Sequence, residues 1–187
     1  MHKFKFEKNA SLIYQLFFME PEIYLRHLEN EKSHWWFKGR RKIIHSIIKK
    51  KTGSQNKKLN ILDFGAGSGT NIKTLSNFGN VYVYEKDRKT SNYLKLRFKK
   101  SKKIKVIKKT NKKNFFDLII AADVLEHIKN DRLIINNLRR YLKKNGKLLV
   151  TVPAYQFLFS KKDFALHHFR RYSKNSLVKL FKNRFKI

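Results

Sequence analysis

Three glycines, Gly65, Gly67 and Gly69, stand at every second position in the segment ILDFGAGSG. Glycines spaced in this way after a short strand let the backbone turn sharply and approach a ligand closely. Asp63 stands at the start of this loop, and the loop contains no lysine. Because a phosphate-binding loop of the P-loop type carries a lysine, the segment predicts a loop for another kind of ligand. The alternative is a glycine-rich turn that binds nothing.

The acidic residues of this chain gather where strands are expected to end. There are only 13 Asp and Glu in total, and four of them stand at or just after predicted strand ends: Asp63, Glu85, Asp123 and Glu126. No Lys or Arg occurs in the segments 61–72, 114–128 and 148–160. Burial explains why strand interiors lack charge, but it does not explain acids at the strand ends without bases beside them. We therefore expect a site prepared for a cation.

Glu85 indicates what else the ligand contains. It ends the second predicted strand about twenty residues after the glycine loop, where a carboxylate can accept hydrogen bonds from both hydroxyls of a ribose. The predicted ligand thus has a ribose, a positive charge and no essential pyrophosphate. S-adenosylmethionine, with its sulfonium and ammonium groups, fits this description.

Strand-like and helix-like stretches alternate after residue 59. The predicted strands are 60–64, 81–85, 104–108, 115–123 and 147–153, and the predicted helices are 70–78, 87–100, 130–144 and 173–183. This alternation predicts an α/β fold, a Rossmann-like parallel sheet with helices on both faces. In such a sheet, ligands bind at the carboxyl ends of the strands.

Residues 1–52 are predicted to form a helical cap or lid, and residues 53–187 the cofactor-binding domain. Apolar side chains recur at helical spacing near the end of the cap, at Trp36, Ile43, Ile44, Ile47 and Ile48. The spacing predicts an amphipathic helix with a basic outer face.

The composition sets wider limits on the chain. Its 187 residues suit one domain with a sizeable core, and the absence of cysteine excludes a disulfide framework and thiolate metal sites. No apolar run reaches the roughly 18 to 20 residues that cross a bilayer. We therefore expect a cytoplasmic protein, with peripheral attachment to a membrane left open.

The net charge of +32 favours an anionic partner, which would be a nucleic acid, an anionic membrane face or an anionic substrate. A compositional bias toward Lys, Asn, Ile and Phe is the alternative explanation, because the basic residues are spread along the whole chain.

Four motifs together resemble those of the class I S-adenosylmethionine-dependent methyltransferases. ILDFGAGSG resembles the first motif of that family, VYVYEKD its second-strand acid, FDLIIAADVLEHI its fourth-strand motif, and LKKNGKLLVTVP its turn into the fifth strand. The flanking segments HWWFKGRRKII and HHFRRYS resemble a subgroup related to the ubiquinone-biosynthesis methyltransferases, whose members often accompany cell-surface glycan or lipid pathways.

The resemblance implies a set of cofactor-binding residues. The methionine part would lie against Asp63, Gly65, Ala66, Gly67 and Gly69, the ribose against Glu85, the adenine near Thr110 and Asn111, and the region of the methyl group against Ala122, Asp123 and Leu125. The family has seven strands, and this chain stops where the sixth should begin. We therefore expect the last two strands to be missing, either because the chain is a fragment or because part of the substrate wall comes from elsewhere.

Three histidines are candidates for a general base, His127 first and His167 and His168 next; the alternative for each is a histidine that only packs or makes hydrogen bonds. Asp123, Glu126 and His127 also form D-x-x-E-H, with His168 as a fourth ligand, which resembles the E-x-x-E-H of relatives that bind a divalent ion. We nevertheless expect no metal, because Asp is shorter than Glu and a helical turn would place Glu126 and His127 on different faces.

Aromatic and basic side chains are the candidates for acceptor binding. Trp36 is predicted to cover the substrate, and Arg40 to reach an anionic group on it. Arg170 and Arg171 are predicted to clamp a phosphate or carboxylate. The alternatives are a helix that packs on the sheet and a solvated pair of charges.

The sequence thus predicts methyl transfer from S-adenosylmethionine to a small-molecule acceptor, or to one linked to a lipid or glycan, at an oxygen atom. An RNA methyltransferase, favoured by the net charge, ranks lower because no RNA-binding module is recognisable. The other alternative is a non-catalytic relative that binds a membrane or a partner protein. A nicotinamide-dependent dehydrogenase ranks last because the pyrophosphate loop is lacking.

Overall fold

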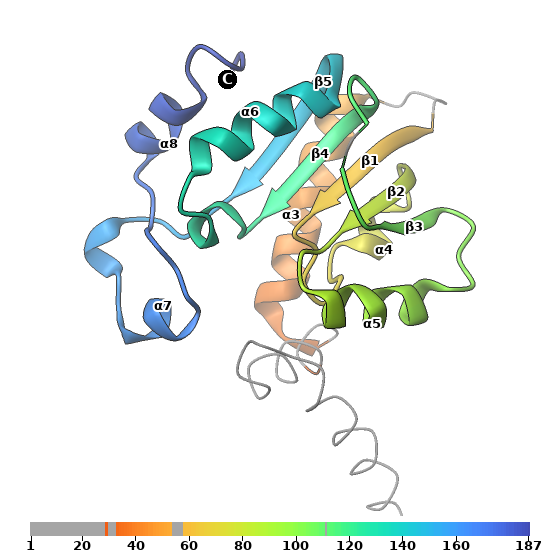
Figure 1. Ribbon diagram of the computed structural model, residues 1–187, viewed down its shortest axis with the longest axis horizontal. Helices are drawn as coiled ribbons and strands as arrows, with labels where there is room; N and C mark the ends of the chain where they lie inside the picture. Colours follow the sequence, from red (N-terminus) through yellow and green to blue (C-terminus); the bar gives the residue numbers. More distant parts are fainter. Residues whose placement is uncertain (1–28, 30–32, 54–57, 111) are drawn as a thin grey trace, which may run out of the picture.

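The computed structural model describes residue 29 and the ranges 33–53, 58–110 and 112–187 (Figure 1). Its centre is a sheet of five parallel strands in the order β3-β2-β1-β4-β5. The strands are β1 (Leu59–Phe64), β2 (Gly79–Tyr84), β3 (Ile104–Ile107), β4 (Phe116–Ala122) and β5 (Leu142–Thr151). The helices are α3 (Trp35–Thr52), α4 (Ile72–Leu75), α5 (Arg88–Phe98), α6 (Asp131–Tyr141), α7 (Lys161–Ala165) and α8 (Lys174–Phe181), with short 3-10 turns η1 (Leu125–His127) and η2 (Gln156–Leu158).

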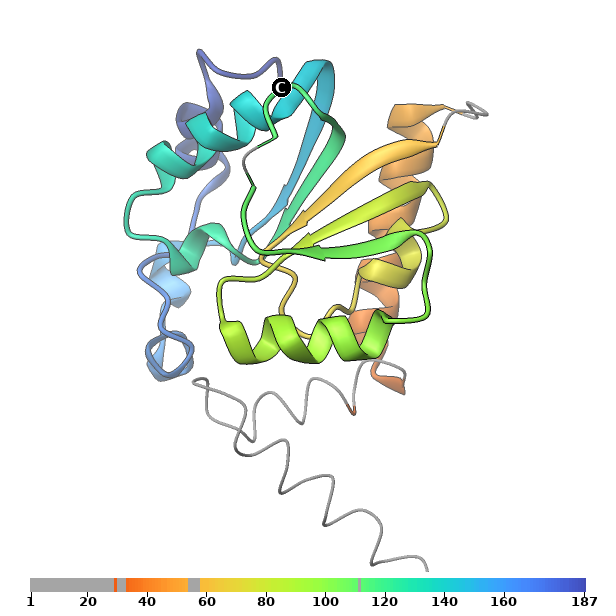
Figure 2. The ribbon, with the colours of Figure 1, turned by 45° about the vertical axis from the view of Figure 1, so that its right-hand side comes forward.

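Helices cover both faces of the sheet, which confirms the predicted Rossmann-like α/β fold (Figure 2). Side chains alternate along each strand, so neighbouring residues enter different cores. Ile61 and Ile120 pack with side chains of α3, α4 and α5, whereas Leu62 and Ile119 pack with Leu138 of α6. A smaller apolar cluster joins α6, α8 and η1. The two larger apolar cores therefore lie on the two faces of the sheet.

The order of the strands creates a switch point between β1 and β4. The chain proceeds outward from β1 through β2 to β3, and then returns to the other side of β1 with β4 and β5. Connections therefore diverge at the carboxyl ends of β1 and β4, which is where parallel α/β sheets bind ligands.

Several elements differ from the sequence prediction: α7 was not predicted, β5 begins earlier than expected, and α4 and α6 are shorter. The helix expected over 70–78 is the short α4, and β2 begins at Gly79, two residues earlier than the predicted strand. The helix expected to end at Asn145-Gly146 ends at Tyr141, because Leu142 is buried and already pairs with Phe116 of β4. Burial of one leucine thus outweighs the helical tendency of the lysines that follow it. The ladder then resumes with Leu118 opposite Lys147 after a register shift.

The amphipathic helix predicted at the end of the cap is present as α3. Ile44 and Ile48 are buried and join the same core as the sheet residues, whereas Ile43 and Ile47 on the outer side are exposed. The predicted helical structure of residues 1–28 lies outside the described residues. The boundary between cap and domain at residues 52 and 53 stays a prediction, although α3 shares the core of the sheet.

Along its outer edge, β5 borders a groove of about 890 Å³ that also touches α3 and α8. None of the predicted site residues lines this groove. Within the described ranges, no helix is both long enough and apolar enough to cross a bilayer.

The shared core predicts how α3 responds to mutation. We expect Ile48→Ala to lower the free energy of unfolding by about 2–5 kcal/mol, because it removes buried methyl groups and leaves a cavity. Ile43→Ala is the matched control, since Ile43 is 61% exposed, and its effect should stay within about 1 kcal/mol. Urea unfolding measures both values. Equal small effects would mean that α3 is a detachable lid.

Candidate functional site

The three glycines of the loop after β1 differ in what surrounds them. All three have positive φ angles, +72°, +53° and +83° for Gly65, Gly67 and Gly69. A Cβ atom at Gly65 would lie 2.7 Å from Val124 Cγ2, and one at Gly69 would lie 2.8 Å from Leu94 Cδ2. Nothing lies within 4 Å of the corresponding position at Gly67. The outer two glycines therefore allow close packing, and Gly67 is the one that faces open space.

Glu85, directly after β2, is held next to that open space. Its Oε2 accepts a hydrogen bond of 2.9 Å from the Gly67 N–H, and its Oε1 accepts one of 3.0 Å from the Asp87 N–H. Each carboxylate oxygen has two lone pairs, so both oxygens keep capacity for a ligand. The backbone thus fixes a carboxylate beside Gly67 in the orientation that a ligand with hydroxyl groups needs.

Asp63, the next acid of this site, is buried at the end of β1. Its Oδ2 has no hydrogen-bond partner among the residues that the structure describes. Burial raises the pKa of Asp63 to about 7; Arg40 lowers the pKa and Glu85 raises it further. Since a buried polar atom without a partner is costly, this oxygen is a place where a ligand donor or cation would be stabilised.

Asp123, after β4, is tied to both neighbouring elements. Its backbone has a positive φ of 56°, and its N–H donates to the Thr151 carbonyl oxygen at 2.9 Å. The Thr151 hydroxyl donates to Oδ1 at 2.9 Å, and the Arg40 guanidinium forms an ion pair with Oδ2. Arg40 also lies 3.4 Å from the hydroxyl oxygen of Thr70, next to the glycine loop.

Arg40 was predicted to reach an anionic group of the acceptor, and that role stays a prediction. In the structure its guanidinium already links α3 to β4 and to the glycine loop, while its Nε is buried without a partner in the described chain. Sequence reasoning missed this ion pair because Arg40 and Asp123 are 83 residues apart and no local pattern connects them.

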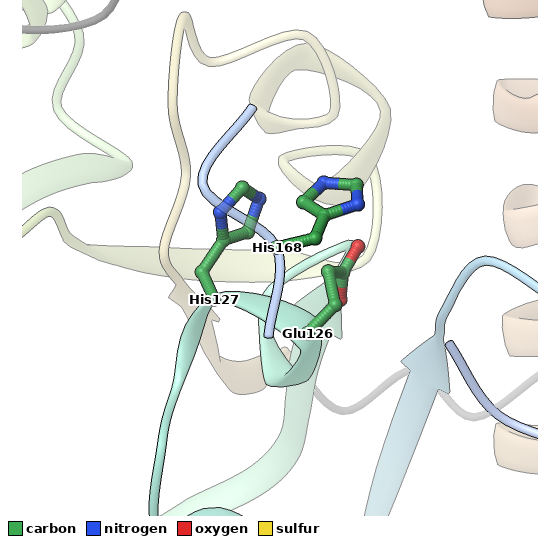
Figure 3. Close-up of side chains that lie close together, drawn as sticks. All are labelled: Glu126, His127 and His168. Atoms are coloured by element: carbon green, nitrogen blue, oxygen red, sulfur yellow. The ribbon is translucent and has the colours of Figure 1, made fainter. Parts of the chain in front are cut away.

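A cluster of three metal-ligating side chains lies beside these acids (Figure 3). One ligating atom from each of Glu126, His127 and His168 lies within 4.8 Å of the others. Asp123 does not belong to this cluster. The expectation that a helical turn separates Glu126 from His127 is wrong, because η1 is a single 3-10 turn and both side chains face His168.

Burial shifts the pKa values of two residues in the cluster. Glu126 is buried, one of its carboxylate oxygens has no partner within the described ranges, and burial raises its pKa to about 8. Burial and the neighbouring His168 lower the pKa of His127 to about 4. The two imidazole rings meet edge to face, with centroids 4.6 Å apart. Burial therefore favours the uncharged forms of both Glu126 and His127.

His168 is oriented by a buried carboxylate. Its Nδ1 lies 2.9 Å from Asp163 Oδ1, and Arg171 donates to both oxygens of Asp163 at 2.9 and 2.8 Å. The Arg171 hydrogen bonds hold the pKa of Asp163 well below its usual range. Because Asp163 is then a carboxylate, Nδ1–H of His168 donates to it, and Nε2 of a neutral His168 is left as the acceptor.

Arg170 and Arg171, the predicted substrate clamp, are both engaged by carboxylates of the protein. Arg171 holds Asp163, and Arg170 forms an ion pair with Asp131 at 2.9 Å and donates to the Lys129 carbonyl oxygen. Their clamping role stays a prediction, but each guanidinium has a structural task in the described chain.

The remaining predicted residues are placed as follows. Ala122 is half-buried at the end of β4, and Thr110 is half-buried after β3. The Leu125 side chain is fully buried against Ile135 and Tyr172, so it faces the core instead of the open strand ends. Trp36 is exposed near the start of α3. Asn111 lies outside the described residues.

Comparison with known proteins identifies the class to which this fold and site belong. A family model described as "Methyltransferase domain" matches residues 25–184. The chain belongs to this family, and it is a class I S-adenosylmethionine-dependent methyltransferase domain.

The individual relatives share about a third of their residues or fewer with this chain over the matched part. An uncharacterised protein of Methanocaldococcus jannaschii is 35% identical over 58% of this chain and 48% of its own length. A ubiquinone biosynthesis O-methyltransferase of Rickettsia canadensis is 29% identical over 68% of this chain and 61% of its own length. The chain thus spans about half to three fifths of the length of these curated relatives.

Among solved structures, a putative methyltransferase of Bacillus halodurans superimposes with a TM-score of 0.62 at 16% identity, covering 74% of this chain and 68% of its own. At this identity the likeness supports the fold alone.

The burial of Asp63 predicts a dependence of stability on pH. Asp63 ionises near pH 3.8 in the unfolded chain and near pH 7 in the folded one, so the unfolded state releases this proton first. The contribution of Asp63 to the free energy of unfolding should therefore fall between about pH 4 and pH 7, by roughly 2–4 kcal/mol. Asp63→Asn, which cannot ionise, should lack this fall. Urea unfolding of both proteins across that range measures it, and parallel curves would contradict the assignment.

Proposed function

We propose that this domain binds S-adenosylmethionine at the carboxyl ends of β1, β2 and β4 and transfers its methyl group to a small-molecule or lipid- or glycan-linked acceptor, at an oxygen atom. The observation that carries the proposal is the Glu85 carboxylate, which two backbone N–H groups hold beside the open face of Gly67. Membership of the methyltransferase family supports the identity of the cofactor.

The charges of the site match the two ends of this cofactor. Glu85 is placed to accept the ribose hydroxyls. The partnerless oxygen of Asp63 suits the positively charged methionine end. The buried Nε of Arg40, which has no partner among the described residues, is a donor that the carboxylate of the methionine part can use. No lysine lies in the loop to attract a phosphate-bearing cofactor.

Methyl transfer is an in-line displacement at carbon, in which the acceptor oxygen forms a bond to the methyl carbon as the sulfur leaves. Positioning of the two reactants supplies at most roughly 7 to 11 kcal/mol in favourable cases. A hydroxyl acceptor must also lose its proton, and a general base adds about 10² to 10⁴ in rate. We assign this proton to Nε2 of His168, because Asp163 holds the ring and His127 has a lowered pKa that makes it a weaker base. The O-methyltransferase activity in the names of the Rickettsia relatives supports an oxygen acceptor.

Isothermal titration calorimetry tests the cofactor site. We expect Glu85→Gln to weaken binding of S-adenosylmethionine by about tenfold or more, because charged hydrogen bonds to the ribose are lost. Asp117→Asn is the matched control: this acid pairs with Lys143 at the opposite end of β4, and its loss should leave the affinity unchanged.

A second comparison isolates the charge of the cofactor. Asp63→Asn should weaken S-adenosylmethionine more than S-adenosylhomocysteine, since only the former carries the sulfonium. Absence of any binding by the folded wild-type protein at millimolar cofactor would overturn the proposed function.

A divalent ion on Glu126, His127 and His168 is the second candidate for the chemistry of this site, in place of the metal-free site expected from the sequence. The donors fit an ion on three counts: one oxygen of Glu126 is partnerless in the described chain, burial favours neutral His127, and Asp163 bonds Nδ1 of His168 so that Nε2 remains as a ligand atom. A carboxylate behind a histidine is the usual support of a metal ligand. One carboxylate with two imidazoles favours Zn²⁺ or another transition metal over Mg²⁺. When bound, such an ion would lower the pKa of an acceptor hydroxyl.

Equilibrium dialysis against Zn²⁺ and Mn²⁺, followed by metal analysis of the protein, distinguishes the two assignments. If the cluster is a metal site, the wild-type protein should retain one equivalent that His168→Asn loses. His45→Asn is the control, because His45 packs on Phe78 of a different region. A wild-type protein that retains no metal would leave His168 with the role of base alone.

A further inference from the structure

The segment that follows β5 leaves the sheet and returns to the same point. Ala154 and Tyr172 form an isolated parallel bridge, and backbone hydrogen bonds of 3.0 Å join Tyr155 N–H to the Tyr172 carbonyl and Tyr172 N–H to the Pro153 carbonyl. We call residues 154–172 the β5–α8 loop. It contains η2 and α7, and it lies at the carboxyl end of β5 (Figures 1 and 2). It therefore flanks the proposed methyl-transfer site.

The interior of this loop is polar. Asp163 is buried there, and it binds the guanidinium of Arg171, the imidazole of His168 and the backbone N–H of Ser160. A further backbone hydrogen bond of 2.7 Å joins Phe169 N–H to the Glu126 carbonyl and fixes the loop to η1. These hydrogen bonds hold the loop in shape without an apolar core of its own.

The exterior of the loop is apolar, which reverses the usual arrangement. Five large apolar side chains of the loop are exposed to solvent: Tyr155, Phe157, Leu158, Phe164 and Phe169. Phe157 and Phe164 are 81% and 70% exposed. Some of the rings contact one another: the ring centroids of Tyr155 and Phe157 lie 5.5 Å apart, and those of Phe159 and Phe164 lie 5.0 Å apart. Exposed apolar side chains that gather in one segment mark an interaction surface.

The charges of the loop indicate the chemistry of the partner. Lys161 and Lys162 are exposed between the aromatic residues, and the loop's one acid, Asp163, is buried. The surface therefore combines aromatic and aliphatic side chains with positive charge alone, on a chain whose net charge is +32. Phe and Tyr near lysines suit the boundary between acyl chains and anionic headgroups. Leu158 would insert into acyl chains, whereas stacking on nucleic-acid bases uses aromatic side chains.

We propose that the β5–α8 loop docks this domain onto an anionic phospholipid surface. Phe157, Phe164 and their apolar neighbours insert at the interface, and Lys161 and Lys162 contact headgroup phosphates. Docking through this loop turns the strand ends that carry the proposed methyl-transfer site toward the bilayer, where a lipid-linked acceptor is presented. The docking itself requires neither cofactor nor acceptor, so it is tested apart from the proposed function.

Co-sedimentation with vesicles tests the apolar contacts, first with phosphatidylcholine alone and then with phosphatidylcholine and phosphatidylglycerol. The variant is Phe157→Ser/Phe164→Ser, and the matched control is Leu96→Ser/Leu133→Ser on α5 and α6, where the leucines are 69% and 54% exposed. Neither variant changes the net charge, so adsorption driven by charge alone affects both equally. We expect the loop variant to bind mixed vesicles about tenfold or more weakly than wild type, and the control to bind like wild type.

A second pair of variants tests the lysines. Lys161→Glu/Lys162→Glu and Lys99→Glu/Lys100→Glu change the net charge by the same amount, and all four lysines are exposed. Only the first pair lies in the loop, so it should lose more affinity for mixed vesicles. Relative to wild type, whose own tryptophans are Trp35 and Trp36, Phe157→Trp should add a blue-shifted emission with these vesicles, whereas Leu96→Trp should not.

Equal binding by the loop variants, their controls and wild type would overturn the proposal. So would complete loss of wild-type vesicle binding at about 0.5 M salt, because inserted side chains resist screening. If the loop variants lose the wild-type binding to single-stranded RNA but keep vesicle binding, the loop is a nucleic-acid surface and the proposal is wrong. Calorimetry with S-adenosylmethionine on Phe157→Ser/Phe164→Ser should give the wild-type affinity, which separates a failure of docking from a failure of the cofactor site.

Discussion

The register of β1 with its two neighbours is the constraint on which the site depends. Asp63 of β1 lies opposite Val83 of β2 on one side and Ile120 of β4 on the other. The two neighbouring strands therefore end within a few residues of this level, and Glu85 and Asp123 follow directly. A shift of one residue in either ladder would move every side chain of that strand to the opposite face. The buried apolar residues on both faces thus hold the register, and the register brings the three acids to the same edge of the sheet.

Bringing these acids together and burying them is unfavourable when they are ionised, and two features of the protein reduce this effect. Arg40 of α3 supplies a cation at this edge, where it pairs with Asp123 and lowers the pKa of Asp63. Burial raises the pKa values of Asp63 and Glu126 to about 7 and 8, which favours their protonated forms and reduces the repulsion between the acids. Each has an oxygen without a partner in the described chain, so a cationic ligand would favour the ionised forms again.

The sequence alone predicts the sheet and the cofactor edge because both depend on local patterns. The stretches 60–64 and 115–123 are short and apolar, and the acids stand at their ends. The contacts that cross the fold have no such pattern. The Arg40–Asp123 pair forms only after packing brings α3 to the end of β4, and the Asp163–Arg171 pair forms only after the β5–α8 loop folds back on itself. Tertiary packing also ends α6 at Tyr141, because burial of Leu142 outweighs the helical tendency of the following lysines.

Asp163 connects the candidate chemistry of the site to the candidate membrane surface. One of its oxygens orients His168, while Arg171 binds both oxygens and Ser160 binds the second, which keeps the β5–α8 loop in shape. The carboxylate that holds the His168 ring beside Glu126 and His127 is therefore also the one that keeps the loop in shape. His168 is itself part of the β5–α8 loop, so a displacement of the loop at a lipid surface would move the imidazole and strain its hydrogen bond of 2.9 Å to Asp163. Because that bond sets the ring orientation, contact between the loop and a membrane would alter the geometry of the base or metal ligand directly, without any change in the sheet.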